Sequence, residues 1–241
     1  MAIKRRTHVY QGPGGPFEGV FAWDDAGTAP RPGVLVLPNV LGQKEADNRK
    51  AEDLARLGYA ALVADVYGQG KRTTRESPDM AVYMNELGRD RPLLRDRLEV
   101  SLGELKAMAE VDAGRTAAIG FCFGGKCVLD MARSGLDVLG GVSFHGVYDR
   151  PDYDNVSPIR AKLLICHGWD DPLGPPDAVA GLAAELTEGQ ADWELDAYGH
   201  AGHAFTDEST RNSARPGFGY QEAADRRSWA RMQDFLTELF A

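Results

Sequence analysis

Residues 117–125 read Ala-Ala-Ile-Gly-Phe-Cys-Phe-Gly-Gly, and the fold of the chain can be worked out from them. The apolar residues 117–119 predict a short buried strand, and the residues after Gly125 predict a helix. A strand, a sharp turn and a helix around a nucleophilic side chain form a nucleophile elbow, here with cysteine where serine is usual. Small residues are needed beside Cys122 because the strand and the helix pass very close to it. The alternative is that Cys122 is simply a small buried apolar residue.

Other short apolar runs predict the rest of the sheet. Residues 34–37 are continuously apolar and too short for a helix, as in a strand that is buried on both faces. Further strands are predicted at 60–64, 139–144, 163–166 and 193–198, and an N-terminal hairpin at 7–10 and 18–23. Helices are predicted at 45–57, 93–109, 126–133, 177–186 and 221–240.

This alternation predicts one α/β domain over residues 1–241, with about eight mostly parallel strands and helices on both faces. The longest irregular segment is 68–91, which is rich in charge and is a candidate rim over a site.

Composition and charge narrow the class of partner. The chain has 27 Lys and Arg against 36 Asp and Glu, a net charge of −9, which argues against a nucleic-acid binder. Three cysteines, an odd number, make a disulfide framework unexpected and suggest a reducing compartment. No apolar run approaches the roughly 18 residues of a membrane span, and no secretory signal is apparent. We therefore expect a cytoplasmic monomer with a small-molecule partner.

Chemically useful side chains follow the predicted strands. In an open parallel sheet, ligands bind at the carboxyl ends of the strands. Cys122 is followed along the chain by Asp170 or Asp171, and then by His200 or His203. Nucleophile, acid and histidine in this order are typical of a hydrolytic triad, in which the acid orients the histidine and the histidine takes the proton of the nucleophile.

Three motifs together resemble a known family. They are the Gly-x-Cys-x-Gly-Gly elbow, the Gly168-Trp-Asp-Asp loop that ends in Pro175, and the His203-Ala-Phe triplet. From about residue 33 to the C-terminus the chain resembles the dienelactone hydrolases. The resemblance implies an eight-stranded α/β-hydrolase fold without a large cap domain. It also implies that the nucleophile is Cys122, the acid Asp171 and the base His203, with the backbone amides of Val40 and Phe123 as oxyanion donors.

The sequence departs from that family at two places. Asn39 stands where the family has a glutamate that partners the thiol, and an amide cannot take the thiol proton, so direct deprotonation by His203 is expected. After the histidine, Asp207 and Glu208 stand where an arginine would bind an anionic substrate. Four arginines of the irregular segment are alternatives for that role: Arg72, Arg75, Arg89 and Arg91.

The expected reaction is hydrolysis of an ester, lactone or thioester through an acyl-thioenzyme, without a cofactor or metal. A thiolate leaves more readily than a simple alkoxide, so substrates with stabilised leaving groups suit it best. We expect Asn39, Trp169 and Phe205 to contact the substrate, and His145 and His167 to be buried histidines with satisfied hydrogen bonds.

Three other interpretations remain open. Gly120, Gly125 and Lys126 have the spacing of a phosphate-binding loop, although Cys127 replaces the hydroxyl that would bind Mg²⁺. His200 and His203 could form part of a metal site. Finally, the fold could be non-catalytic, with Cys122 acting as a redox sensor.

Overall fold

The computed structural model describes residues 2–241 and contains one eight-stranded sheet. Its strands are β1 (Ile3–Gly12), β2 (Gly15–Asp24), β3 (Arg31–Leu37), β4 (Ala60–Val63), β5 (Val111–Phe121), β6 (Gly140–Phe144), β7 (Lys162–Gly168) and β8 (Trp193–Tyr198). Its helices are α1 (Glu45–Arg56), α2 (Val82–Arg89), α3 (Arg91–Lys106), α4 (Phe123–Arg133), α5 (Pro176–Glu188) and α6 (Glu222–Leu239), with a 3₁₀ turn, η1 (Glu208–Thr210). All the predicted strands and helices are present.

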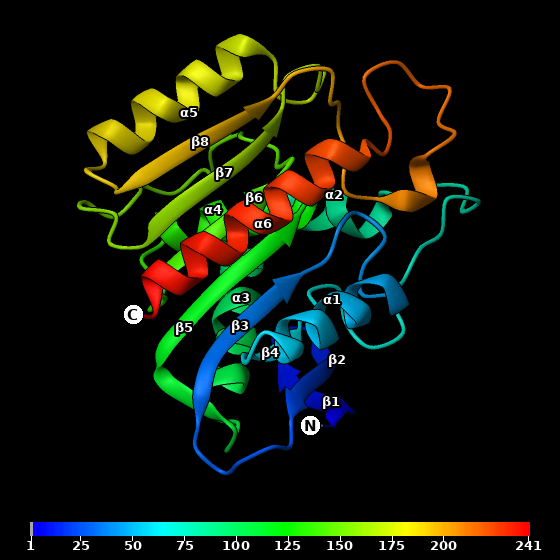
Figure 1. Cartoon of the computed structure of the whole chain (residues 1–241). Helices are drawn as coiled ribbons and strands as arrows, with labels where there is room; N and C mark the ends of the chain where they lie inside the picture. The colour runs from blue at the N-terminus through cyan, green and yellow to red at the C-terminus, as the bar shows by residue number, and fades with distance from the viewer. Residues whose placement is uncertain (1) are drawn as a thin grey trace.

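The strand order is β1-β2-β4-β3-β5-β6-β7-β8 (Figure 1). β1 and β2 form the predicted antiparallel hairpin, and β2 pairs antiparallel with β4. The strands from β4 to β8 are parallel to one another. The prediction of an α/β-hydrolase fold with about eight mostly parallel strands is confirmed, and residues 2–241 contain no inserted cap domain.

Helices cover both faces of the sheet because alternate strand residues point to opposite sides. In β3, Val34 and Val36 join the apolar cluster that includes residues of α1 and α6. Leu35 and Leu37 join the cluster on the other face, with residues of α3, α4 and α5. In Figure 1, α1 and α6 lie in front of the central strands and α3 and α4 lie behind them. All four β3 side chains are fully buried, which explains the uninterrupted apolar run.

The segment 68–91 is more regular than its charge suggests, because it contains α2. This helix has only eight residues, and Leu87 is the only one that is fully buried. It also lacks a side-chain N-cap. Eight residues make only about two turns, which is too short for an apolar period to be recognised in the sequence.

The parallel strands bring the loops after β3, β5, β6, β7 and β8 to one edge of the sheet. These loops carry the residues expected to carry out the chemistry. In the described part of the chain, no helix is long and apolar enough to cross a membrane.

Candidate active site

Cys122 lies at a sharp turn between β5 and α4. Its φ of 56° and ψ of −112° are a sparsely populated conformation for any residue other than glycine. Its N–H donates to the carbonyl of Phe144 at 3.0 Å, which ties the turn to β6. A Cβ on Gly124 would lie 2.0 Å from the carbonyl oxygen of Leu37, and one on Gly120 would lie 2.0 Å from the oxygen of Gly124. The elbow can therefore form only because glycine lets the start of α4 approach the backbone of β3.

Asp171 and His203 meet across 32 residues of sequence. His203 Nδ1 donates to Asp171 Oδ2 at 2.8 Å, and Asp171 Oδ1 accepts from the N–H of Leu173 at 2.8 Å. Both side chains are buried, and the N–H of His203 donates to the carbonyl of Gly217 at 2.7 Å. The carboxylate therefore keeps the proton of the neutral ring on Nδ1. The other ring nitrogen, Nε2, is buried and has no hydrogen-bond partner of normal geometry among the described residues.

Cys122 and His203 alter each other's protonation. Burial raises the pKa of the Cys122 thiol, but the charge and hydrogen bonding of His203, together with two backbone amides, outweigh burial, so the pKa is lowered overall. Burial lowers the pKa of His203, but the negative charge of Cys122 and the bond to Asp171 raise it to about 10. These opposite directions favour a thiolate beside an imidazolium at neutral pH.

Two backbone amides also act on the sulfur. The N–H groups of Phe123 and Val40 both favour the thiolate form of Cys122 and contribute to its lowered pKa. The turn that presents Val40 is held by Asn39 Oδ1, which accepts from the N–H of Leu41 at 3.1 Å. Tyr67 donates its hydroxyl hydrogen to the carbonyl of Val40 at 3.2 Å. Among the described residues no hydrogen bond joins Asn39 to Cys122, so the Asn39 side-chain oxygen shapes the turn.

The two members of each candidate pair lie in different surroundings. Asp170 and His200 are exposed, whereas Asp171 and His203 are buried together. Trp169 is 49% exposed and is not among the residues that line the cavity described below.

Phe205 is fully buried in the core, where its ring lies 5.1 Å from that of His145 and 5.5 Å from that of Tyr198. It also does not line the cavity, so its placement is that of a packing residue.

His145 differs from its prediction as a fully satisfied histidine. Its Nε2 is hydrogen-bonded to Thr206 Oγ1 at 2.8 Å, but its Nδ1 is buried without a partner among the described residues. Its ring centroid lies 5.2 Å from that of His203. By contrast, His167 Nδ1 is hydrogen-bonded to the hydroxyl of Tyr148 at 2.8 Å. The position of His145 at a strand end was a signal in the sequence, but nothing there connected it with Thr206.

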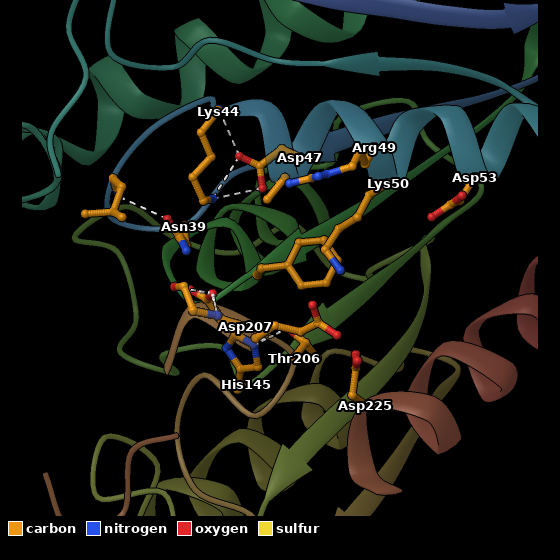
Figure 2. Close-up of a pocket in the computed structure, with 15 residues that line it drawn as sticks. Asn39, Lys44, Asp47, Arg49, Lys50, Asp53, His145, Thr206, Asp207 and Asp225 are labelled. Carbon is orange, nitrogen blue, oxygen red and sulfur yellow. Dashed lines mark hydrogen bonds and ion pairs between the residues drawn. The ribbon is translucent and has the colours of Figure 1, made fainter. Parts of the chain in front are cut away.

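A cavity of about 600 Å³ lies beside this centre, between α1, the ends of β5 and β6, and the loop after β8 (Figure 2). Its lining includes Asn39, Lys50, Phe121, His145, Thr206 and Asp207. Lys50 Nζ lies 4.5 Å from the ring centroid of Phe121, and burial lowers the pKa of this lysine. The sequence did not indicate Lys50. Asn39 and His145 link the cavity to the centre, since they adjoin Val40 and His203 respectively.

Most of the arginines considered as anion ligands are held in ion pairs. Three form ion pairs at 2.5–3.1 Å: Arg72 with Asp65, Arg75 with Asp207, and Arg91 with Asp130. Arg89 is exposed on α2. The pairing of Arg75 also offsets the negative charge of Asp207 at the cavity.

The geometry also bears on the phosphate-loop and metal interpretations. Lys126 Nζ pairs with Asp149 at 2.6 Å, and the glycines before it are packed against protein backbone. In residues 2–241, no three His, Cys, Asp or Glu side chains are grouped so that they could hold a metal ion.

Comparison with known proteins gives consistent matches. The model of the dienelactone hydrolase family matches residues 17–240. A Bradyrhizobium sp protein named "Probable 2-oxo-3-(5-oxofuran-2-ylidene)propanoate lactonase" is 30% identical over 194 residues, which cover 77% of each chain. Two solved structures cover the whole chain: m3DLH, with a TM-score of 0.94 and 35% identity, and P91, with 0.91 and 34%. P91 is described as a dienelactone hydrolase-like promiscuous phosphotriesterase from metagenomic libraries. From the match over most of its length, the chain belongs to the dienelactone hydrolase family.

Proposed function

We propose that the protein hydrolyses esters, lactones or thioesters, with Cys122 as nucleophile, His203 as acid and base, and Asp171 as the group that orients His203. The observation that carries this proposal is the buried 2.8 Å hydrogen bond between His203 and Asp171, in a histidine whose charge and hydrogen bonding help to lower the pKa of the Cys122 thiol. A nucleophile, a base and an orienting acid in this relation are what nucleophilic catalysis requires.

The first half of the reaction forms a thioester. The Cys122 thiolate attacks the carbonyl carbon, and the electron pair of the C=O bond moves to oxygen. The N–H groups of Val40 and Phe123 stabilise this oxyanion, because they already favour negative charge on the sulfur. The oxyanion then re-forms the carbonyl and expels the leaving group, which takes a proton from the His203 imidazolium.

The second half regenerates the enzyme. Neutral His203 accepts a proton from water as the water oxygen attacks the thioester carbon. Collapse of the second oxyanion breaks the C–S bond and releases the acid, and the thiolate again faces an imidazolium. Asp171 accepts a hydrogen bond from the Nδ1–H of His203 throughout, which keeps Nε2 available for both proton transfers.

The thiolate limits which substrates are suitable. A thiolate, whose parent thiol has a pKa near 8.5, is a better leaving group than a simple alkoxide. The tetrahedral intermediate formed from an alkyl ester therefore expels the thiolate, and returns to the ester, more often than it expels the alkoxide. Enol lactones, aryl esters and thioesters have leaving groups that compete well with sulfur. The Bradyrhizobium relative named as a lactonase supports the choice of lactones. Arg75 is paired with Asp207 and is therefore not free to bind a substrate carboxylate.

The test is a substrate panel of an aryl ester, an enol lactone and a thioester, assayed with the wild type and with Cys122→Ala. We expect at least about a 10³-fold loss of kcat/KM in the variant, the scale seen when a catalytic nucleophile is removed. Acid quenching during turnover, followed by mass spectrometry, should find the acyl group on the peptide that contains Cys122.

Cys127→Ala is the matched control. Cys127 is fully buried five residues away, and burial raises the pKa of its thiol, so this thiol should be unreactive. Cys127→Ala should therefore keep the wild-type kcat/KM. Equal rates for wild type and Cys122→Ala would refute the proposal. Iodoacetamide labelling of Cys122 with no turnover of any substrate would favour the redox-sensing interpretation instead.

A further inference from the structure

Thr206 lies three residues after His203, and its hydroxyl joins the loop after β8 to the end of β6. Thr206 Oγ1 and His145 Nε2 are 2.8 Å apart although 61 residues separate them in sequence. Both residues are buried, and Figure 2 shows the bond beside the cavity. A hydrogen bond shielded from water in this way constrains the loop more than an exposed one would.

His145 adopts an unusual backbone conformation, with φ of 38°. A residue other than glycine is strained in this region, and such residues cluster at functional sites. The N–H of His145 donates to the carbonyl of Cys166 at 2.8 Å, which ties it to β7. The preceding residue, Phe144, accepts the N–H of Cys122 at 3.0 Å. The same strand end therefore anchors the nucleophile turn and the loop that carries His203.

The ring of His145 also contacts the ring of His203. Their centroids are 5.2 Å apart with planes at 68°, an edge-to-face arrangement. Phe218 makes a second aromatic contact with His203, at 5.4 Å. Together with the hydrogen bond to Asp171, these contacts fix both the position and the rotation of the imidazole.

His145 is uncharged while its ring contacts that of His203. Burial, and then the positive charges of His203 and Lys50, hold the pKa of His145 well below its ordinary value of 6.5. A cation at 5.2 Å from His203 would disfavour the imidazolium that stabilises the Cys122 thiolate, and a neutral ring avoids this.

We propose that His145 is a positioning residue, which holds the loop carrying His203 in place over Cys122 through its hydrogen bond to Thr206. The inference rests on the proposed function, because the position of His203 matters to catalysis only if the two side chains react together.

The main test compares Thr206→Val, which removes the hydroxyl at nearly constant shape, with Thr206→Ser, which keeps it. We expect Thr206→Val to lower kcat at least about tenfold with little change in KM, since a small misplacement of a catalytic group is costly. Thr206→Ser should restore most of the rate. Thr237→Val, at an exposed threonine of α6, is the control for loss of a hydroxyl elsewhere.

A second measurement needs no substrate. The rate of Cys122 alkylation by iodoacetamide, followed against pH, reports the pKa of its thiol. In Thr206→Val we expect the profile to move to higher pH, because a displaced imidazolium stabilises the thiolate less. Cys127 and Cys166 are buried with raised pKa values, and Cys122→Ala measures their background.

His145→Asn closes a double-mutant cycle with Thr206→Val. Asparagine tolerates positive φ, but its side chain is too short to reach Thr206. His145→Asn should lose at least as large a factor in kcat as Thr206→Val, because it also removes the ring contact with His203. The double variant should lose little more than His145→Asn alone, because both changes remove the same hydrogen bond.

Three outcomes are decisive. If Thr206→Val and His145→Asn fold as the wild type does and match it in kcat and in the alkylation profile, the positioning role is wrong. If the losses multiply in the double variant, the bond between the two residues is not the cause, and the proposal is again wrong. If the alkylation profile moves but turnover does not depend on Cys122, His145 positions His203 as proposed and only the hydrolase assignment fails.

Discussion

The imidazole of His203 binds its proton more firmly than a free histidine does. Asp171 accepts from one nitrogen and the Cys122 sulfur places negative charge near the other, and together they raise the pKa of His203 to about 10. The same pairing lowers the pKa of the Cys122 thiol. The reactive ion pair should therefore exist over a wide range of pH that includes neutrality.

This pairing predicts the pH dependence of kcat/KM. Activity should rise as Cys122 loses its proton, below the ordinary range for a thiol, and should fall near pH 10 as His203 loses the proton needed by the leaving group. Asp171→Asn should move the alkaline limb to lower pH, because a negative charge that holds the proton is gone. It should also lower kcat by about 10²–10⁴-fold.

The matched control is Asp170→Asn, since Asp170 is the exposed neighbour of Asp171. Its pH profile should superimpose on that of the wild type. An Asp171→Asn profile with the wild-type rate and the wild-type alkaline limb would contradict the assigned role of Asp171.

At the scale of elements, the start of α4 depends on a close approach to β3. A Cβ at Gly124 would meet the carbonyl oxygen of Leu37 at 2.0 Å, and this backbone cannot move without disturbing the centre of the sheet. The contact also sets the position of the Phe123 amide, which lies at the first residue of α4.

Gly124→Ala should therefore destabilise the protein by more than about 3 kcal/mol, at or beyond the upper end for overpacked cores. Gly103→Ala is the matched control, because this glycine lies inside α3 and a Cβ there meets nothing within 4 Å. It should stabilise the protein by about 0.5–1 kcal/mol. Urea unfolding followed by circular dichroism measures the stability of both variants. Equal midpoints would show that the close approach of α4 to β3 does not limit the residue at position 124.

At the scale of the whole molecule, buried charges join the helices on one face of the sheet. Arg133 of α4 is fully buried and pairs with Glu185 of α5 at 2.8 Å. Arg91 of α3 pairs with Asp130 of α4 through two hydrogen bonds. Arg133 also donates to the carbonyl of Tyr148, in the segment that follows β6. The network thus links three helices to a loop near the site.

Removal of one partner from such a network leaves the other charge buried. Arg133→Ala should lower the free energy of unfolding by about 3–5 kcal/mol, the range for a broken buried pair. Arg115→Ala breaks the surface pair of Arg115 with Asp112, in which both side chains are more than a third exposed. This substitution should change the free energy of unfolding by less than about 1 kcal/mol. Similar unfolding midpoints for the two variants would show that the buried network does not stabilise the fold.

Much of this architecture could be predicted because its signals are local. The apolar run at 34–37 predicted a strand buried on both faces, and the glycines around Cys122 predicted the elbow. α2 was not predicted, since its eight residues make only about two turns, too few for an apolar period to be recognised. The packing position of Phe205 was equally hidden, because an aromatic residue at a strand end has the same sequence pattern whether it faces core or solvent.

The sequence by itself determined the succession of strands and helices along the chain, the family, and the residue types at the ends of the strands. Only the tertiary structure brought Asp171 and His203 together in the interior, left Asp170 and His200 exposed, and joined His145 to Thr206. The reason is physical: strands and turns follow from neighbouring residues, whereas these contacts join positions 32 and 61 residues apart, whose meeting depends on how the whole sheet twists and packs.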